Sequence, residues 1–421
     1  MTATVLPSPA QDTVRPPARP AHRDGNVLRW LGAYTSSMIG DNVFYIALSW
    51  AAVHAGTPSQ AGLVMSVSAV PRALLMLGGG VVADRFGPRK VVIGSDAVRC
   101  AAVLTVAALL LVTGPGLWLL ALLAVVFGIV DAVFMPAVGA LPARITGRDQ
   151  LARVQGMRGL AIRSANVLGA PLGGLAVALG GSATAFALAG TLIAVSVPLL
   201  ILVRMRELPP GEAADPSDRT AWRDLRDGLR HIRGHRVLAP LIAVIALGDL
   251  GFVGPLNVGL TLLADRRGWG ASGMGWVIAA FGTGAGAAAL LLTLRGRLPR
   301  AGTIAAVAIL GGSVAIGSLA FVPTVAGAVG VALVVGLLAG LSGALCAALI
   351  QTLSDPAYLG RVSAVAGIVS LGLAPLGMPV TAAAIGRWGT GPVFVTSAAV
   401  CGLGGVLALC VRDLRRAELP R

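Results

Sequence analysis

The chain has 421 residues, of which 56% are hydrophobic and only 12% are charged, with a formal net charge of +15 at pH 7. Soluble globular proteins average about 25% charged residues, so too little polar surface remains here to keep a chain of this size in water. The basic excess alone would suggest a nucleic acid partner, but so apolar a chain belongs in a membrane, and we expect no nucleic acid partner.

Residues 1–29 are rich in Pro, Ala and Arg and contain no apolar core. They lack the hydrophobic segment of a cleavable signal sequence, so we expect a disordered cytoplasmic tail. The four cysteines all lie in apolar stretches without CxxC spacing, and the four histidines lie at the periphery of the predicted spans. We therefore expect no metal site.

Twelve apolar segments follow, each close to the length of about 20 residues that an α-helix needs to cross a bilayer. They cover residues 30–53, 61–82, 91–112, 117–137, 160–179, 185–203, 238–263, 274–294, 302–322, 325–349, 362–384 and 393–411. This pattern predicts an all-α membrane protein with 12 transmembrane helices.

Basic residues are distributed very unevenly among the connecting segments. If the N-terminus is cytoplasmic, 27 of the 33 Lys and Arg residues fall on the cytoplasmic side and 3 on the opposite side. An excess of Lys and Arg in cytoplasmic loops sets the orientation of membrane proteins. We therefore expect a multi-pass protein of the inner or plasma membrane with both termini in the cytoplasm.

The longest polar stretch divides six spans from six. The predicted divisions are the tail at 1–29, an N-terminal six-helix bundle at 30–203, a cytoplasmic linker at 204–237, a C-terminal six-helix bundle at 238–411, and a cytoplasmic tail at 412–421. Within the linker, apolar residues at helical spacing alternate with arginines, namely Trp222, Leu225, Leu229 and Ile232. They predict an amphipathic helix that either lies on the anionic membrane surface or packs on the protein.

Short sequence matches relate the two halves. Two of them share an offset of 208 residues and a third has an offset of 204: 39–44 with 247–252, 151–154 with 359–362, and 170–173 with 374–377. A shared offset predicts two pseudo-symmetric six-helix bundles. Parallel repeats of this kind build secondary transporters that move around a central site.

The loop between the second and third spans, residues 80–90, reads GVVADRFGPRK. It resembles the G-x-x-x-D-R-x-G-R-[KR] loop of the major facilitator superfamily, with a proline before the basic pair. The glycines permit close helix approach and a tight turn, and the acid can accept hydrogen bonds from a helix N-terminus. The resemblance implies a gating loop that latches the two bundles in the outward-open state, made of Gly80, Asp84, Arg85, Gly87, Arg89 and Lys90. We expect its last two basic residues at the cytoplasmic lipid face; the alternative is a polar hairpin that only follows the charge rule.

Further matches make residues 30–411 similar to the drug:proton antiporter branch of this superfamily, which includes macrolide efflux pumps, Tap-like pumps and enterobactin exporters. The matching segments are 40–41, 71–72, 96–99, 134–137 and 360–363. In the fifth span, Gly169, Pro171, Gly173 and Gly174 resemble the antiporter motif G-P-x-x-G-G. Proline is displaced by one residue, so we expect a displaced kink. The arginine that many antiporters carry in the fourth span is replaced by an apolar stretch near Ala124, so the coupling chemistry must differ in detail.

Ionisable residues inside a membrane span are costly, and each normally has a partner or a function. We expect three ion pairs from the predicted spans, namely Asp41 with Arg72, Asp131 with Arg163, and Asp96 with Arg99. The last pair has i,i+3 spacing within one helix and is expected to be mainly structural.

Three acids are candidates for carrying a proton: Asp41, Asp249 and, third, Asp131. Burial favours the neutral carboxyl, whereas a neighbouring arginine favours the charged one, and this balance can let an aspartate titrate during transport. Asp249 has no basic partner in its own half. The alternative is that Asp41 and Asp131 are locked in structural ion pairs.

A largely apolar central cavity is expected between spans 1, 4 and 7. The candidate lining residues are Phe44, Tyr45, Phe134, Met135, Phe252 and Asn257. Helix packing is the alternative for each aromatic side chain.

These observations predict a secondary transporter that exports hydrophobic or amphipathic small molecules, such as drugs and antibiotics, by proton antiport with alternating access. The alternatives are export of a siderophore or an endogenous metabolite and, less favoured, a non-transporting sensor. No catalytic set indicates an enzyme, and the sole lysine precedes Val91, which excludes the phosphate loop of an ATP-driven pump. We expect a monomer in the lipid bilayer, with a small-molecule substrate and protons as partners and no cofactor beyond the proton gradient.

Overall fold

The computed structural model describes residues 23–113, 116–205, 221–295, 300–355 and 358–418, and these residues form helices with no strand among them. The first half contains α1 (Gly25–Ala55), α2 (Pro58–Val67), α3 (Ala69–Phe86), α4 (Pro88–Thr113), α5 (Leu117–Ile145) and α6 (Arg148–Ile201). The second half contains α7 (Ala221–Gly234), α8 (Leu238–Gly254), the π-helical turn η2 (Pro255–Gly259), α9 (Leu260–Arg266), α10 (Gly270–Arg295), α11 (Ala301–Leu319), α12 (Val325–Leu353), α13 (Leu359–Gly367), the π-helical turn η3 (Ile368–Leu373), α14 (Ala374–Trp388), α15 (Thr390–Cys410) and α16 (Arg412–Arg415).

Each of the twelve predicted spans falls on a helical segment. Within the described residues, eight continuous helices are long and apolar enough to cross a membrane, and one of these is the double-length α6. The second predicted span is divided into α2 and α3, and the seventh and eleventh contain the π-helical turns. The architecture is therefore the predicted all-α membrane fold, and its helix count is consistent with twelve crossings.

Helix α6 consists of two limbs that run in opposite directions. Its regular geometry is interrupted at Gly180 and at Gly181, whose φ of 73° is readily adopted only by glycine. Along the first limb, Gly169 and then Gly173 face Asn42 and then Ile46, so this limb runs parallel to α1. Along the second limb, residue 192 lies near residue 36 and residue 199 near residue 32, so it runs antiparallel.

The same packing plan occurs in both halves. In the first half, α1 packs on both limbs of α6, α3 packs on α5, and α4 packs on α5 and α6. In the second half, α8 packs on α14 and α15, α10 on α12, and α11 on α12 and α15. Gly128 of α5 and Gly336 of α12, which are 208 positions apart, each lie against a backbone carbonyl of the neighbouring helix. The sequence repeat is thus a repeat of helix packing.

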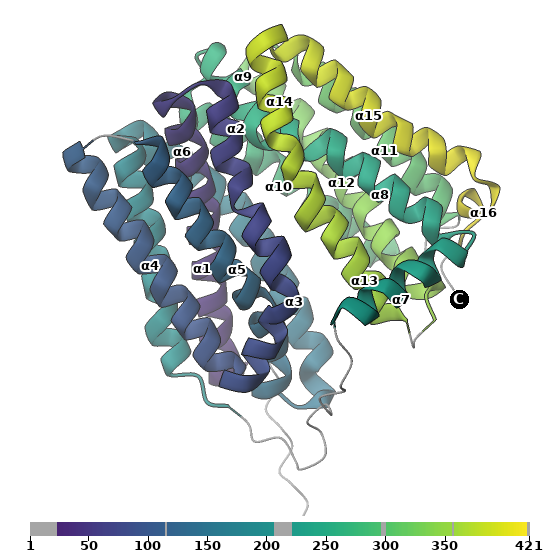
Figure 1. Ribbon diagram of the computed structural model, residues 1–421, viewed down its shortest axis with the longest axis horizontal. Helices are drawn as coiled ribbons and strands as arrows, with labels where there is room; N and C mark the ends of the chain where they lie inside the picture. Colours follow the sequence, from purple (N-terminus) through teal and green to yellow (C-terminus); the bar gives the residue numbers. More distant parts are fainter. Residues whose placement is uncertain (1–22, 114–115, 206–220, 296–299, 356–357, 419–421) are drawn as a thin grey trace, which may run out of the picture.

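The two bundles meet through α2 with α14, α6 with α10, and α1 with α9. Figure 1 shows α2, α9 and α14 at the top of the molecule, whereas α7, α13 and α16 lie lower. We call the two ends of the molecule the α9 end and the α7 end. At the α9 end, the Ser49 and Thr261 hydroxyl groups lie 2.5 Å apart across the two bundles. Nearby, His54 Nε2 lies 3.4 Å from an Asp265 carboxylate oxygen.

The boundary of the predicted N-terminal tail needs correction. Helix α1 begins at Gly25, before the predicted boundary at residue 30, because the Asp24 side chain caps it by accepting a hydrogen bond from the Asn26 amide. Residues 1–22 and 206–220 lie outside the described part of the chain, as do residues 419–421. The predicted C-terminal tail begins with the short helix α16, whose Leu414 is buried.

The predicted amphipathic helix of the linker is α7, and it packs on the C-terminal bundle. Gly228 lies against Arg361, Ile232 is buried, and the His231 ring stacks on Tyr358 with centroids 4.4 Å apart. Leu229 is exposed, and the side chains of the other two apolar residues of the pattern, Trp222 and Leu225, lie outside the described part of the chain. Protein packing therefore accounts for one face of this helix.

Candidate functional site

The N-terminal bundle encloses a cluster of charged side chains centred on Arg99. Its guanidinium lies 2.9 Å from Asp41 and 3.4 Å from Asp131, and it also bonds the Asp96 carboxylate one helical turn earlier. Arg72 of α3 lies 3.8 Å from the other carboxylate oxygen of Asp131. We call these five residues the Arg99 cluster.

Neutral groups complete the surroundings of the Arg99 cluster. The hydroxyl groups of Ser37 and Ser196 both donate to the Asp96 carboxylate, and Ser37 also accepts from Arg99. The Phe134 ring lies 3.9 Å from the Arg99 guanidinium carbon, in cation–π geometry. Arg99 is fully buried, so this cluster satisfies a charge that would otherwise be very costly in the membrane.

Two of the three predicted ion pairs are wrong. Asp41 pairs with Arg99 rather than Arg72, and Asp131 pairs with Arg72 and Arg99 rather than Arg163. The reason is geometric, because α4 places Arg99 between α1 and α5, where it is within reach of both acids. The predicted contact between Asp96 and Arg99 is present.

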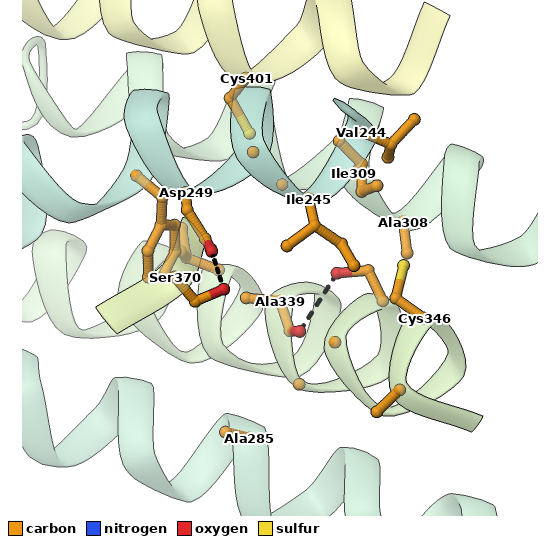
Figure 2. A pocket seen from close by; sticks show the side chains of 18 of the residues that line it. Val244, Ile245, Asp249, Ala285, Ala308, Ile309, Ala339, Cys346, Ser370 and Cys401 are labelled. Atoms are coloured by element: carbon orange, nitrogen blue, oxygen red, sulfur yellow. Dashed lines mark hydrogen bonds between the residues drawn. The ribbon is translucent and has the colours of Figure 1, made fainter. Parts of the chain in front are cut away.

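The C-terminal bundle contains a cavity of about 600 Å³. Its lining is mostly aliphatic or small, and the largest contribution comes from α12. Among its lining residues are Val244, Ile245, Asp249, Phe252, Ala308, Ile309, Val335, Ala339, Cys346, Ser370 and Cys401 from the C-terminal bundle, and Arg163 and Asn166 from the first limb of α6. Figure 2 shows Ile245, Asp249, Cys346 and Ser370 around the cavity.

Asp249 is the acid of this cavity, and its carboxylate accepts a 2.5 Å hydrogen bond from the Ser370 hydroxyl (Figure 2). Within the described residues, no arginine, lysine or histidine lies within ion-pair distance of Asp249. Ser370 belongs to the π-helical turn η3, and such turns often occur at functional sites because they break the regular backbone hydrogen bonding of a helix.

Five of the six predicted cavity residues do not line this cavity. Phe44 is fully buried and stacks on Phe127 with ring centroids 3.7 Å apart, and Phe134 is buried beneath Arg99. These aromatic side chains fill the N-terminal bundle, so the helix-packing alternative is the right one for them. Three more predicted residues do not line the cavity. Tyr45 lies beside Asp131, and Met135 and Asn257 are exposed. Only Phe252 lines the cavity.

The predicted gating loop forms the turn between α3 and α4. Gly87 has a φ of 85°, as the tight turn requires, and Arg85 lies over the Phe86 ring. Arg89 donates hydrogen bonds to the carbonyls of Leu200 and Ile201, so it caps the C-terminal end of α6 instead of facing lipid.

The surroundings of Gly80 and the side chain of Asp84 lie outside the described part of the structure. Lys90 is exposed. The contacts of Arg89 therefore tie the loop to its own bundle.

The antiporter-like segment of the fifth span forms a helix interface. Gly169 and Gly173 lie against α1, and Gly174 lies against the Ala271 carbonyl of α10. Helix α6 continues through Pro171, and its non-helical residues come later, at 180 and 181. This segment therefore brings α6 close to both α1 and the opposite bundle.

Sequence reasoning missed several residues of these sites. Ser37 carries a recognisable signal, since it precedes Asp41 by one helical turn on α1. Ser370 and Asn166 carry none, because a single serine or asparagine in an apolar helix indicates no particular partner. Only the folded chain shows that Ser370 meets Asp249.

Comparison with known proteins agrees with this architecture. Residues 30–375 match the sequence profile of the Major Facilitator Superfamily, and the chain belongs to that superfamily. It is therefore a multi-pass membrane transporter of small molecules and not an enzyme.

Particular relatives and structures refine this assignment. The chain is 29% identical over 368 residues to proteins named enterobactin exporter EntS from Shigella boydii and Escherichia fergusonii, covering 85% of this chain and 84% of each relative. It superposes on the nucleoside transporter NupG with a TM-score of 0.72 at 13% identity, covering 92% of this chain and 100% of that one. A bacterial homologue of the lysosomal transporter Spinster gives a TM-score of 0.66 at 14% identity, over 92% and 95% of the two chains. These two likenesses show the fold.

Proposed function

We propose that this transporter exports hydrophobic or amphipathic small molecules, drugs and antibiotics among them, by proton antiport with alternating access. The observation that carries the proposal is an apolar cavity of about 600 Å³ whose acid, Asp249, has no cation within ion-pair distance among the described residues. A carboxyl group in such surroundings can exist in the neutral form and release its proton when the surroundings change.

The α7 end is the cytoplasmic end in this proposal. The start of α1, the turn between α3 and α4, the linker helix α7 and the C-terminal helix α16 share that end, and each of these segments carries basic residues. Cytoplasmic loops of membrane proteins are enriched in Lys and Arg. The protein then lies in the cell membrane as a monomer, with both termini in the cytoplasm and its bundles in contact at the outer end.

The Arg99 cluster is a second place for a proton. It brings three carboxyl groups, from Asp41, Asp96 and Asp131, together with the guanidinium groups of Arg72 and Arg99. If all five groups are charged, one negative charge remains in excess inside the bundle, so binding of one proton makes them neutral as a set. Asp41 and Asp131 lie at the less buried side of the cluster and are the acids that would exchange it.

The gating loop completes the cycle in this proposal. Arg89 is held by the carbonyls of α6 within its own bundle. When the α7 end closes, the gating loop latches the two bundles together, as the resemblance of its motif implies. The contacts at the α9 end separate at the same time, since a rocking movement opens one end as it closes the other.

Transport into inverted vesicles tests the proposal. Vesicles with an imposed pH gradient are given a panel of dyes and antibiotics, and both substrate uptake and proton release are recorded. We expect wild-type protein to couple the two and Asp249→Asn to abolish proton-driven uptake. Asp227→Asn, the same change at an exposed position of α7, serves as the control. Full proton-driven uptake by Asp249→Asn would falsify the role of this carboxyl group.

Export of a siderophore is the second candidate function. It rests on the similarity to the enterobactin exporters, which covers 85% of this chain. Purified protein in the same vesicles is given a siderophore in its iron-free form in place of the dyes. Uptake of the siderophore without uptake of the dyes or antibiotics would favour this candidate over drug export.

A further inference from the structure

The N-terminal bundle contributes two neighbouring side chains to the cavity, Arg163 and Asn166 of α6. They are three residues apart and so lie on the same face of the helix, one turn from each other. Both face α10 at glycines: a Cβ atom at Gly286 would lie 3.9 Å from Arg163 Cδ, and one at Gly282 would lie 3.5 Å from Asn166 Cβ. The two glycines leave room for these polar side chains at the boundary between the bundles.

Both side chains have unused hydrogen-bond donors. Among the described residues, no carboxylate lies within 4.0 Å of the Arg163 guanidinium, and the Arg99 cluster leaves this arginine out. The Asn166 carbonyl oxygen accepts a 3.3 Å hydrogen bond from the Asn42 amide, which fixes the other end of Asn166 as a donor. No described residue accepts a hydrogen bond from that NH₂ group.

The remaining polar groups of the cavity are already engaged. The Ser370 hydroxyl donates to Asp249, and the Ser342 hydroxyl donates to the Ala339 carbonyl within α12. The carboxyl group of Asp249 accepts hydrogen bonds, so it cannot serve an acidic substrate when it is charged. Among the described lining residues, the free donors are therefore those of the α6 pair, Arg163 and Asn166.

We propose that Arg163 and Asn166 form an anion-recognition site, and that the substrate is an amphipathic molecule with an acidic oxygen group such as a carboxylate, sulfonate or acidic phenol. The planar guanidinium matches two oxygens of such a group, and the asparagine amide supplies a further donor. The aliphatic lining from α8, α11 and α12 receives the apolar body. This inference rests on the proposed transport function and narrows its substrate class, away from the cations that a lone aspartate alone would favour.

The site also explains how a substrate touches both bundles. Arg163 and Asn166 belong to the N-terminal bundle, whereas the apolar wall and Asp249 belong to the C-terminal bundle. A molecule held by its anionic group on α6 and by its apolar body on α12 bridges the two halves. Protonated Asp249 leaves the cavity with the positive charge of Arg163, which a monoanionic substrate balances.

Binding of three probes with one hydrocarbon body tests the site: 1-pyrenebutyrate, 1-pyrenebutanol and 1-pyrenebutylamine. Binding to purified full-length protein is measured at pH 7 by equilibrium dialysis, without membrane or gradient. We expect the wild type to prefer the carboxylate, and Arg163→Gln to weaken carboxylate binding by about tenfold or more, as loss of a hydrogen bond to a charged group does. Binding of the alcohol should not change.

Matched variants complete the test. Arg153→Gln removes the same charge from an exposed position of the same helix, and it should leave all three affinities unchanged. Arg163→Lys should restore part of the carboxylate preference, and Asn166→Leu should lower carboxylate affinity by about fivefold, as loss of one hydrogen bond does. Equal affinity for the three probes in the wild type, including no binding at all, overturns the proposal, as does unchanged carboxylate binding by Arg163→Gln. Because no gradient is used, failure of proton coupling leaves this readout untouched.

Discussion

The two bundles share one packing plan but use their interiors differently. Helices α5 and α12 have 29 residues each and begin 208 positions apart. In the N-terminal bundle, Phe44 stacks on Phe127. The residues at the corresponding positions of the C-terminal bundle are Phe252, for Phe44, and Val335, for Phe127, and both line the cavity. A smaller side chain therefore leaves open the space that an aromatic stack fills in the other half.

The polar groups follow the same division. Asp131 belongs to the Arg99 cluster, and Ser37 is hydrogen-bonded to it. The residues 208 positions later are Ala339 and Ile245 respectively, and both line the cavity. Asp249 lies at the position that repeats Asp41, so both bundles have a carboxyl group there. The other charged residues of the Arg99 cluster are not repeated in the C-terminal bundle. The comparison shows how a duplicated bundle can divide its tasks: the first half is a cross-linked support, and the second half carries the cavity.

The largest effect, on stability, is expected from disrupting the Arg99 cluster. Arg99→Gln leaves three carboxyl groups of the N-terminal bundle with Arg72 as their remaining guanidinium. Removing one partner of a buried ion pair typically costs about 3–5 kcal/mol. We expect most of the protein to be lost from the folded fraction in detergent, as measured by thermal unfolding and size-exclusion chromatography.

The exposed Arg153→Gln change on α6 is the control, because it removes the same charge outside the cluster. A folded yield of Arg99→Gln equal to that of the control would show that the cluster is not a support. In that event the two bundles would differ in the charged groups that they contain, but the charged groups of the N-terminal bundle would not stabilise its fold.

The next effect is expected from filling the cavity. Val335→Phe places an aromatic ring opposite Phe252, as Phe127 lies opposite Phe44 in the other half. We expect loss of substrate binding by at least about tenfold, since a well-packed aromatic side chain leaves no room for a ligand. Thermal stability should fall by about 1–3 kcal/mol, because Val335 is fully buried and a larger ring at this position crowds the side chains around it.

Val334→Phe is the matched control for this change, since Val334 is the neighbouring residue and is exposed on the outside of α12. Binding of the pyrene probes to both variants gives the measurement. If both variants bind as the wild type does, the cavity is not the site.

A third effect is expected from the reverse change, Phe127→Val, which introduces the C-terminal residue into the N-terminal bundle. It removes the ring stacked at 3.7 Å on Phe44 and leaves a void among fully buried side chains. Large-to-small changes of this kind cost about 2–3 kcal/mol. Thermal unfolding in detergent should show the loss, and proton-driven uptake by the remaining folded protein should persist. An unchanged melting temperature would contradict a tightly packed N-terminal bundle.

Much of this architecture could be predicted from sequence because membrane physics limits the choices. Each apolar segment of helix-spanning length falls on a helical segment, and the short repeats predicted the two bundles. The break of α6 at residues 180 and 181 lies between the predicted spans 160–179 and 185–203. The break within the second span was hidden, because the segments on both sides of it are equally apolar. Helix α7 was predicted from its periodicity, whereas its partner surface came from the fold.

The site residues show where such prediction ends. Each ionisable residue inside the spans was found, because a charge in an apolar segment is conspicuous. The contact of Asp96 with Arg99, within one helix, was predicted correctly. The partners on other helices were not, because pairing between helices depends on the rotation of each helix about its axis, which sequence spacing alone does not fix. The aromatic side chains misled for the opposite reason: their size suits a cavity wall and a packed interior equally well, and Phe44 and Phe134 belong to the interior.

The smallest effect is expected where the two unlike bundles touch. His54 of α1 and Asp265 of α9 form a contact of 3.4 Å at the α9 end, with both side chains almost half exposed, at 45% and 43%. An exposed ion pair contributes up to about 1 kcal/mol, so His54→Gln should shift the ratio of the two end-open states by about fivefold or less. Distances between spin labels at the α7 ends of α6 and α11 report that ratio.

The direction of this effect follows from where the two residues lie. His54 and Asp265 belong to different bundles, so loss of their contact should favour the state that is open at the α9 end. Asp265→Asn should lose the same part of the population closed at the α9 end as His54→Gln does. In the double variant the two losses should not add, because each substitution removes the same contact. Additive losses would mean that His54 and Asp265 act on the bundles separately, and that the contact between them does not help to close the α9 end.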